Sequence, residues 1–351
     1  MNIDKWIAHE SVNESNKINL LCFIFDGGSA SYFAPWKYKL AGDINLIPIL
    51  YPQREKRRTE KMYENMKLFI EDLVKSLETI FKNQYAFFGY CSGAVLAYEA
   101  AVLAKEYYNV DPVYGMIISS EAPKYLPNTV PSCSEENKEQ LFLKHMSGLP
   151  TISDEMLNDR VFLEYYEPII TADYDLLRTY RYKEHEKLNC DFDVIMSPSD
   201  VKVERKKVKE WEKLTNGKTH LFEKEGGHFL VEQQEAFIFQ RLNNRLSLGE
   251  SKNFETRKKV VEEYTEVYSE RQAYILSVWK KILNLETLYG HDNFFLKGGD
   301  SIKAAQIVNY INKETGANIS ITDILKNPEV FALAECVEKK LDHEIVDEGE
   351  I

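Results

Sequence analysis

The sequence predicts an α/β domain followed by a small all-α domain, and three observations predict this division. From residue 1 to about 247, short apolar runs alternate with helical patterns, which is typical of a mostly parallel sheet covered on both faces. Farther along, Ile302, Ala305, Val308 and Ile311 recur at helical spacing. Between these regions, 248–270 is polar and charged with few apolar anchors, so we expect a linker there.

Composition limits the class of protein. The 351 residues are 44% hydrophobic and 28% charged, which suits one large and one small globular domain. The net charge of -12 argues against nucleic-acid or membrane partners, and no apolar run is long enough to span a bilayer. The first residues lack the apolar core of a secretion signal, and five scattered cysteines suit a reducing compartment. We therefore expect a cytoplasmic protein without a metal site.

Six strands and three helices are expected in the larger domain. The strand candidates are apolar runs separated by polar segments, at 18–25, 46–51, 85–88, 114–119, 192–196 and 220–223. Helical spacing of apolar residues follows at 61–81, 94–106 and 201–214. This alternation predicts a mostly parallel sheet with helices on both faces.

The third strand leads directly into Gly89-Tyr90-Cys91-Ser92-Gly93 and then a helix. A strand, a sharp turn and a helix in this order hold a nucleophile at the tip of the turn, where flanking glycines relieve crowding. Cys91 occupies the nucleophile position. Ser92 does not, because its frame would need glycines at 90 and 94. The alternative for Cys91 is a buried structural cysteine.

A nucleophile needs a base, and the base needs a group that orients it. Gly226-Gly227-His228-Phe229 follows the last strand, and Asp200 follows the fifth. The order nucleophile, acid, histidine predicts a Cys91–His228–Asp200 triad. Asp193 is the fallback acid, although it lies near a strand start, and a surface histidine is the alternative for His228.

Two backbone amides are candidates for an oxyanion hole. One is the amide of Ser92, and the other belongs to the loop after the first strand, at Asp26-Gly27-Gly28-Ser29, where Asp26 is the candidate. Each such donor stabilises a transition state by roughly 3 kcal/mol.

Residues 15–247 resemble the type II thioesterases of peptide and polyketide synthetases. The matching segments are Leu21 to Ala30, Tyr51 to Glu55, Gly89 to Glu99, Ser119 to Pro123 and Gly226 to Phe229. The resemblance implies an α/β-hydrolase fold with a helical lid at about 123–187. The lid region is rich in aromatic residues that can line an acyl pocket or pack within the lid: Phe142, Phe162, Tyr165, Tyr166, Tyr174 and Tyr180.

Three residues depart from the pattern of that family. Cys91 replaces serine, Tyr90 replaces histidine, and Asp26 replaces a small apolar residue. An acyl-cysteine is itself a thioester, so transfer to a second thiol remains reversible, whereas an acyl-serine ester favours water as the final acceptor. A helix N-terminus and His228 are expected to lower the pKa of Cys91. Asp26 either points away from the site or pairs with the ammonium of an aminoacyl substrate.

Two basic segments are candidates for docking an acidic carrier domain. They are Arg57-Arg58, near the second strand, and the lysine-rich stretch 202–213. A solvated surface explains both equally well.

Ser301 is the candidate for covalent modification in the second domain. It follows Phe294-Phe295-Leu296-Lys297-Gly298-Gly299-Asp300, with Asp300 as a candidate N-cap, so its hydroxyl falls in the first turn of a helix, where an attached phosphate is favoured. A capped surface helix is the local alternative. Residues 271–342 resemble peptidyl carrier domains, from Trp279-Lys280-Lys281-Ile282-Leu283 to Asp323-Ile324-Leu325-Lys326-Asn327-Pro328. The resemblance implies 4'-phosphopantetheine on Ser301, attached by a phosphopantetheinyl transferase.

The expected organisation is a thioesterase-like domain at 1–247, a linker at 248–270, a carrier domain at 271–342 and a disordered acidic tail at 343–351. The expected function is to take an acyl or aminoacyl group from a carrier domain of a synthetase module onto Cys91, and to release it to water or to another acceptor. Two alternatives are a dedicated shuttle transferase between carrier domains and a non-catalytic scaffold that only presents Ser301.

Overall fold

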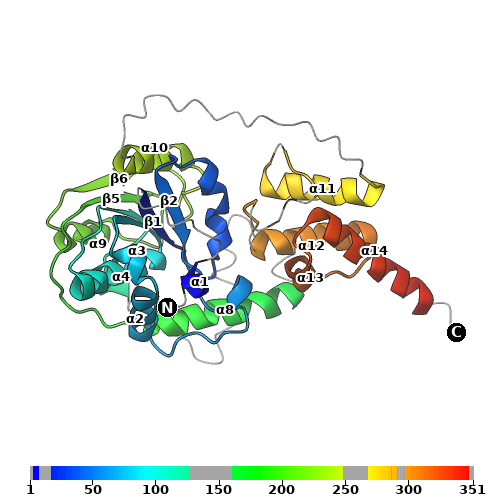
Figure 1. Ribbon diagram of the computed structural model, residues 1–351, viewed down its shortest axis with the longest axis horizontal. Coiled ribbons are helices and arrows are strands. Elements are labelled where there is room, and N and C mark those ends of the chain that lie inside the picture. The colour runs from blue at the N-terminus through cyan, green and yellow to red at the C-terminus, as the bar shows by residue number, and fades with distance from the viewer. Residues whose placement is uncertain are drawn as a thin grey trace. The chain divides into compact units, whose positions relative to one another are not determined.

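The computed structural model describes residues 3–7, 17–126, 160–247 and 268–347, except 286, 291, 293, 295, 296 and 300 (Figure 1). For 3, 4, 160–162, 164, 165, 301, 302, 325 and 342–347 it describes the backbone alone. The chain forms two compact units. The larger contains the described residues up to 126 and from 166 to 247, and the smaller contains 160–165 and 268–347. The expected linker lies outside the described residues except at its end, where Ser269 caps a helix.

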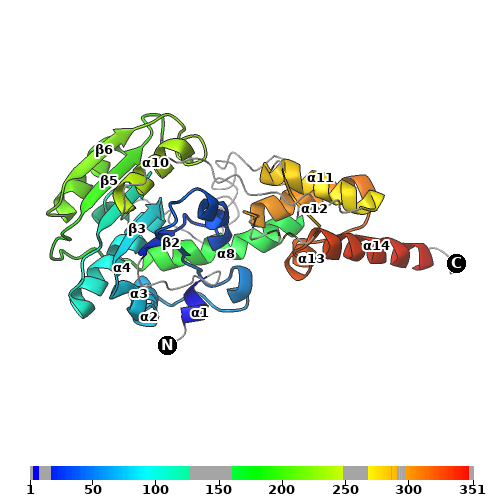
Figure 2. The same cartoon turned by 45° about the horizontal axis from the view of Figure 1, so that its top comes forward.

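A six-stranded parallel sheet forms the centre of the larger unit, in the order β2-β1-β3-β4-β5-β6. Figure 2 shows the strands side by side and twisted. All six predicted strands are confirmed: β1 (Ile18–Phe23), β2 (Ile44–Pro48), β3 (Tyr85–Tyr90), β4 (Tyr114–Ile118), β5 (Asp191–Met196) and β6 (Thr219–Glu223). The first strand ends before the predicted residue 25, because the chain turns there and the Gly28 amide donates to the Phe25 carbonyl.

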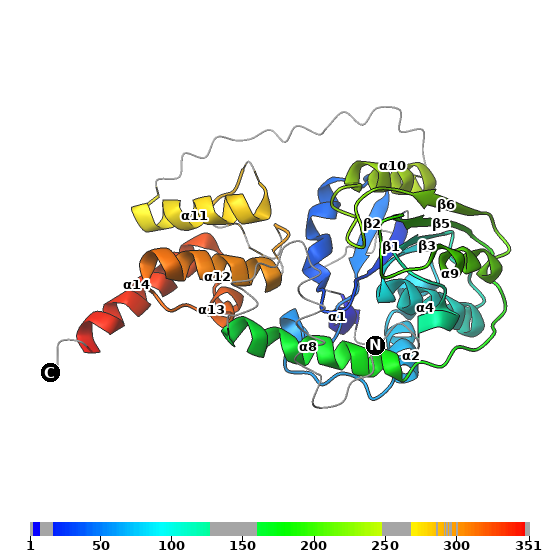
Figure 3. The ribbon, with the colours of Figure 1, turned by 180° about the vertical axis from the view of Figure 1, so that it is seen from behind.

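Helices cover both faces of this sheet (Figures 1 and 3). One face carries the 3-10 helix η1 (Ala30–Tyr38) and α10 (Glu235–Leu246), and Trp36 of η1 contacts both Phe88 of β3 and Phe239 of α10. The other elements are α2 (Met66–Ser76), α3 (Glu78–Phe81), α4 (Ser92–Tyr108), α9 (Arg205–Lys209) and the 3-10 helix η5 (Glu210–Leu214). Because side chains alternate along a strand, Phe87 packs instead against Phe192, whose ring contacts Trp211 of η5.

Two predicted helices are shorter than expected. The helix expected at 61–81 begins at Met66, since the Asn65 side chain accepts a hydrogen bond from the Leu68 amide and caps it. The helix expected at 201–214 begins at Arg205.

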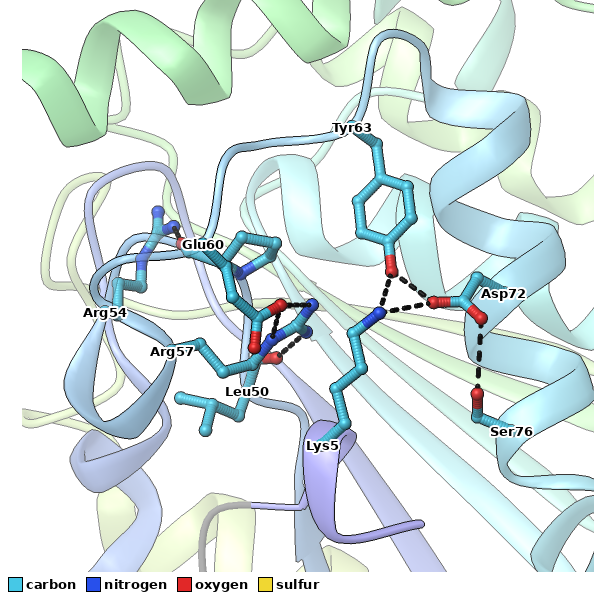
Figure 4. A network of polar contacts seen from close by, with 9 residues as sticks. Lys5, Leu50, Arg54, Arg57, Glu60, Tyr63, Asp72 and Ser76 are labelled. Carbon is cyan, nitrogen blue, oxygen red and sulfur yellow. Dashed lines mark hydrogen bonds and ion pairs between the residues drawn. The ribbon is translucent and has the colours of Figure 1, made fainter. Parts of the chain in front are cut away.

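Arg57 is part of the fold and not of a docking surface, so the expectation for this residue is wrong. It ends the 3-10 helix η2 (Glu55–Arg57), and its side chain is only 2% exposed. It donates to the Leu50 carbonyl and to Glu60, and its guanidinium lies over the ring of Trp6, in the short helix α1 (Ile3–Trp6). Beside it, Lys5 donates to Tyr63 and to Asp72 of α2 (Figure 4). These contacts hold α1 against α2 and against the segment that follows β2.

Most of the expected lid, 127–159, lies outside the described residues. The lid region begins with the 3-10 helix η3 (Pro123–Tyr125), and its described remainder contains α8 (Arg160–Arg178). Tyr166, Tyr174 and Tyr180 are buried in the larger unit. Phe142 and the side chains of Phe162 and Tyr165 are outside the description.

The smaller unit consists of helices α11 (Glu270–Leu283), α12 (Ser301–Thr315), α13 (Ile321–Lys326) and α14 (Val330–Asp347). Trp279 of α11 and Phe294 are fully buried, and their rings pack edge to face at a centroid distance of 5.0 Å. Gly299 lies so close to Phe294 that an added Cβ would approach its ring to 2.5 Å, so the turn before α12 packs on this core.

The helix α14 extends to Asp347, past the expected end of the carrier domain at 342. Residues 343–347 were expected in a disordered tail, and that expectation is wrong for their backbone. The reason is visible in the sequence, where Leu333, Val337, Leu341 and Ile345 recur at a spacing of four and continue one face of the helix. Residues 348–351 lie outside the description.

Candidate active site

Cys91 lies at the tip of a sharp turn between β3 and α4. Its backbone is strained, with φ 54° and ψ -125°. Two positions before and two positions after Cys91, only glycine fits. A Cβ on Gly89 would approach the Ala94 Cα to 2.3 Å, and one on Gly93 would approach the Ile24 carbonyl oxygen to 2.5 Å. The two flanking glycines therefore allow the helix to pack directly on the strand, with Cys91 partly exposed at the carboxyl edge of the sheet.

The structure brings His228 to Cys91. The distance from His228 Nε2 to Cys91 Sγ is 3.3 Å. His228 follows Gly226 and Gly227, which have φ values of 136° and 65°, and the Gly227 amide donates to Ser197 Oγ at 3.1 Å. The glycines let the chain reverse after β6 and return the histidine to the elbow.

Asp200 lies against the other nitrogen of the same imidazole. Its Oδ2 is 2.7 Å from His228 Nδ1, and its Oδ1 accepts from the Lys202 amide at 2.8 Å. A proton on Nδ1 shared with Asp200 leaves Nε2 as the acceptor that faces the thiol. The fallback acid Asp193 contacts different groups, His220 at 3.2 Å and Arg241 at 2.7 Å.

Tyr90 supports the histidine loop, a contact that sequence reasoning missed. Its hydroxyl donates to the His228 carbonyl at 3.2 Å, and its ring packs edge to face against Phe25 and near Phe229. Tyr90 is fully buried. The tyrosine thus connects the Cys91 turn with the loop that carries His228.

Two backbone amides of the loop after β1 are bonded within the protein. The Gly27 amide donates to Asp173 Oδ2 at 2.7 Å, and the Gly28 amide donates to the Phe25 carbonyl at 3.0 Å. The oxyanion candidates predicted from the sequence are the amides of Asp26, in the same loop, and of Ser92. The two candidate residues are also joined through their side chains, because Ser92 Oγ donates to Asp26 Oδ1.

A buried ion pair between Arg54 and Asp173 holds the same loop from behind. The guanidinium of Arg54 donates to Asp173, to the Gly28 carbonyl at 2.6 Å and to the Pro52 carbonyl at 3.0 Å. The side chains of the pair are 2% and 6% exposed. Because Asp173 belongs to α8, one carboxylate connects this helix to the oxyanion loop. Arg54 lies in one of the segments that match the thioesterase pattern, but nothing in the sequence indicated that Asp173 is its partner.

The local charges do not favour a preformed thiolate. Burial raises the pKa of the Cys91 thiol and the Asp26 carboxylate raises it further, whereas Lys202 and the Ser92 amide lower it. This is opposite to the lowered pKa expected from the sequence, because burial and Asp26 outweigh the helix terminus. Burial, with a contribution from Asp173, also raises the pKa of Asp26 to about 6, although Ser92, Lys202 and Arg54 oppose that shift.

In the smaller unit, Ser301 is the first residue of α12. Its side chain and Asp300 lie outside the description, so the expected cap by Asp300 is among the features not described. The first turn of a 15-residue helix offers backbone amides to a phosphate, and Lys303 in this turn adds a positive charge. These residues fit a phosphodiester on Ser301.

The described residues contain no group of three His, Cys, Asp or Glu side chains able to hold a metal ion. No helix among them has both the length and the apolar character needed to cross a bilayer.

Comparison with known proteins decides the family. The family described as "Thioesterase domain" matches residues 18–245, well over half of the chain. The chain belongs to the thioesterase family. A second family, described as "Phosphopantetheine attachment site", matches residues 273–337. The protein is thus a thioesterase domain with a C-terminal carrier domain that bears covalently attached 4'-phosphopantetheine.

The relatives include biosynthetic thioesterases. The chain is 23% identical over 249 residues to the gramicidin S biosynthesis protein GrsT of Aneurinibacillus migulanus, covering 70% of this chain and 95% of that one. It is 27% identical over 237 residues to the thioesterase PikA5 of Streptomyces venezuelae, covering 67% and 83%.

Solved structures confirm the fold. The type II thioesterase BorB from the borrelidin biosynthetic cluster aligns with a TM-score of 0.60 at 23% identity, covering 70% of this chain and 98% of that one. ClbQ from the colibactin NRPS/PKS pathway aligns with a TM-score of 0.57 at 22% identity, covering 65% and 96%. The expected α/β-hydrolase fold and the resemblance to type II thioesterases are both confirmed.

Proposed function

We propose that this thioesterase takes an acyl or aminoacyl group from the thioester of a synthetase carrier domain onto Cys91, and then releases it to water or to another acceptor. The observation that carries the proposal is the line of contacts from Cys91 Sγ to His228 Nε2 at 3.3 Å and from His228 Nδ1 to Asp200 at 2.7 Å. Nucleophile, base and orienting acid are thereby within reach of one another.

Formation of the acyl-enzyme follows from these contacts. His228 Nε2 removes the proton from Cys91 as the sulfur attacks the thioester carbonyl carbon, since Cys91 is a thiol at neutral pH. Asp200 holds the imidazole and stabilises its positive charge. The amides of Ser92 and Asp26 stabilise the tetrahedral oxyanion. When the carbon–sulfur bond of the substrate breaks, the departing thiolate takes the proton from His228, and acyl-Cys91 remains.

The second half-reaction decides between hydrolysis and transfer. His228 can activate either water or an incoming thiol for attack on acyl-Cys91. A cysteine at position 91 favours the second candidate function, a shuttle transferase, because acyl-Cys91 and the carrier thioester are nearly equal in energy and the group can pass on to another thiol.

The chain's own carrier domain completes the proposal. We assign the thioesterase domain to 1–247, the linker to 248–270 and the carrier to 271–342. Ser301 is the attachment residue, and the arm supplies a thiol on which acyl groups are held as thioesters. The partners are carrier domains of synthetase modules and a phosphopantetheinyl transferase. The cytoplasm is the compartment, in keeping with free thiols at Cys22, Cys91, Cys190 and Cys336.

The fate of a labelled acyl group tests the proposal. The full chain is incubated with a radiolabelled acyl thioester on a partner carrier, and free acid and acyl groups on thiols are counted. We expect Cys91→Ala to abolish both products and Cys91→Ser to shift the product toward free acid. Undiminished release and transfer in Cys91→Ala would leave only the scaffold function.

A further inference from the structure

We propose that the Asp26 carboxylate binds the ammonium group of aminoacyl thioesters, so that the site is built for amino-bearing acyl groups. This inference rests on the proposed function of Cys91, and it adds the class of substrate.

The position of Asp26 provides the first argument. It follows β1 at the carboxyl edge of the sheet and receives a hydrogen bond from the hydroxyl of Ser92, the residue after the nucleophile. Its side chain is partly exposed, as is Cys91. A substrate whose carbonyl oxygen lies at the Ser92 and Asp26 amides carries its α-ammonium on the adjacent carbon. That ammonium is therefore close to the Asp26 carboxylate.

An electrostatic conflict between Asp26 and Cys91 provides the second argument. An ionised Asp26 opposes both a thiolate on Cys91 and a negative charge on the tetrahedral oxygen. A carboxylate at this place therefore slows the reaction of acyl groups without a compensating charge. An ammonium on the substrate removes the conflict, because it pairs with Asp26 and lowers the cost of forming the thiolate. Substrate binding and activation of the nucleophile are then coupled.

Among the described residues, charges of both signs act on Asp26: Asp173 raises its pKa, and Lys202 and Arg54 lower it. Arg54 is committed to Asp173 and to the carbonyls of Gly28 and Pro52. Lys202 is exposed, and its ammonium lies 5.3 Å from the centre of the Phe229 ring. Asp200 contacts His228 and the Lys202 amide.

The test compares glycyl and acetyl thioesters of N-acetylcysteamine, which differ only in the amino group. For the full chain we expect kcat/KM to favour glycyl over acetyl. Asp26→Asn should lower this ratio at least tenfold, by slowing glycyl transfer and accelerating acetyl transfer. An unchanged ratio in an Asp26→Asn protein that still depends on Cys91 would overturn the inference and leave the proposed function intact. Activity on both substrates in Cys91→Ala would instead overturn the proposed function.

A measurement on the unsubstituted chain covers the case in which Asp26→Asn does not fold. Asp26 becomes protonated as the pH falls below about 6, whereas the substrate ammonium keeps its charge there. The glycyl-to-acetyl ratio should therefore fall between pH 7 and pH 5. Because both substrates use the same catalytic groups, a pH effect common to the two reactions cancels in the ratio. A ratio that stays constant over this range contradicts an ionised Asp26 as the binding group.

Discussion

At the residue scale, the proposed triad depends on which carboxylate orients His228, and two substitutions separate the candidates. We predict that Asp200→Asn lowers kcat by on the order of 10³-fold or more, because the imidazole loses the partner that fixes its tautomer and stabilises its charge. Asp193→Asn is the matched control. It removes an equally buried carboxylate that contacts His220 and Arg241, so it should lower stability and leave turnover per folded molecule intact. Steady-state kinetics with thermal unfolding measures both.

A second residue-scale prediction concerns Asp26 and pH. Burial raises its pKa from 3.8 to about 6, so the folded protein holds this proton more tightly than the unfolded chain does. Its contribution to stability is therefore largest below pH 4 and is lost as the pH rises through 6. At about 1.4 kcal/mol per pKa unit, Asp26→Asn should stabilise the protein by about 3 kcal/mol at pH 7 and hardly at all at pH 4. Urea unfolding of the thioesterase domain at both values measures this, and an equal effect at both contradicts it.

At the element scale, the sequence predicted the features that depend on residues near one another in the chain. Six strands, the Cys91 elbow and the loops of Asp200 and His228 follow from periodicity, glycines and chain order. The Arg54–Asp173 pair did not, because its members are 119 positions apart and no local pattern connects them. The pKa of Cys91 was also expected in the wrong direction, since burial and the proximity of Asp26 depend on the tertiary fold.

The ion pair that connects α8 to the oxyanion loop gives the prediction at this scale. Removing one member of a buried pair leaves the other charge uncompensated, so Asp173→Asn should cost about 3–5 kcal/mol of unfolding free energy. It also replaces the charged acceptor of the Gly27 amide with a weaker neutral one, and it should lower kcat more than it raises KM. Asp175→Asn is the control on the same helix. Its pair with Arg178 is exposed, so it should change stability by less than about 1 kcal/mol. Equal effects of the two substitutions would contradict the role of the pair.

At the scale of the whole molecule, two chemical functions occupy one chain. The thioesterase fold supplies a nucleophile, and the helical domain supplies a serine for a pantetheine arm. If the linker behaves as a flexible coil, its roughly 23 residues span about 26 Å root-mean-square, which gives the two domains a high concentration relative to each other.

The two functions are separable by substitution. We predict that Ser301→Ala abolishes loading of phosphopantetheine, seen as a missing mass increase after treatment with a phosphopantetheinyl transferase and coenzyme A. The same variant should still cleave small thioesters, because the triad lies wholly in the thioesterase domain. Ser277→Ala, on α11 of the carrier, is the control and should be loaded normally. Loading of Ser301→Ala would place the attachment residue elsewhere.

Peptide mapping of the acylated protein tests the central claim most directly. The Ser301→Ala chain, which has no arm of its own, is incubated briefly with an acyl thioester, quenched in acid, digested and analysed by mass spectrometry. The account predicts an acyl group on the peptide that contains Cys91, and none when Cys91 is also replaced by alanine. An acyl group on another residue, or turnover that continues without Cys91, would contradict it.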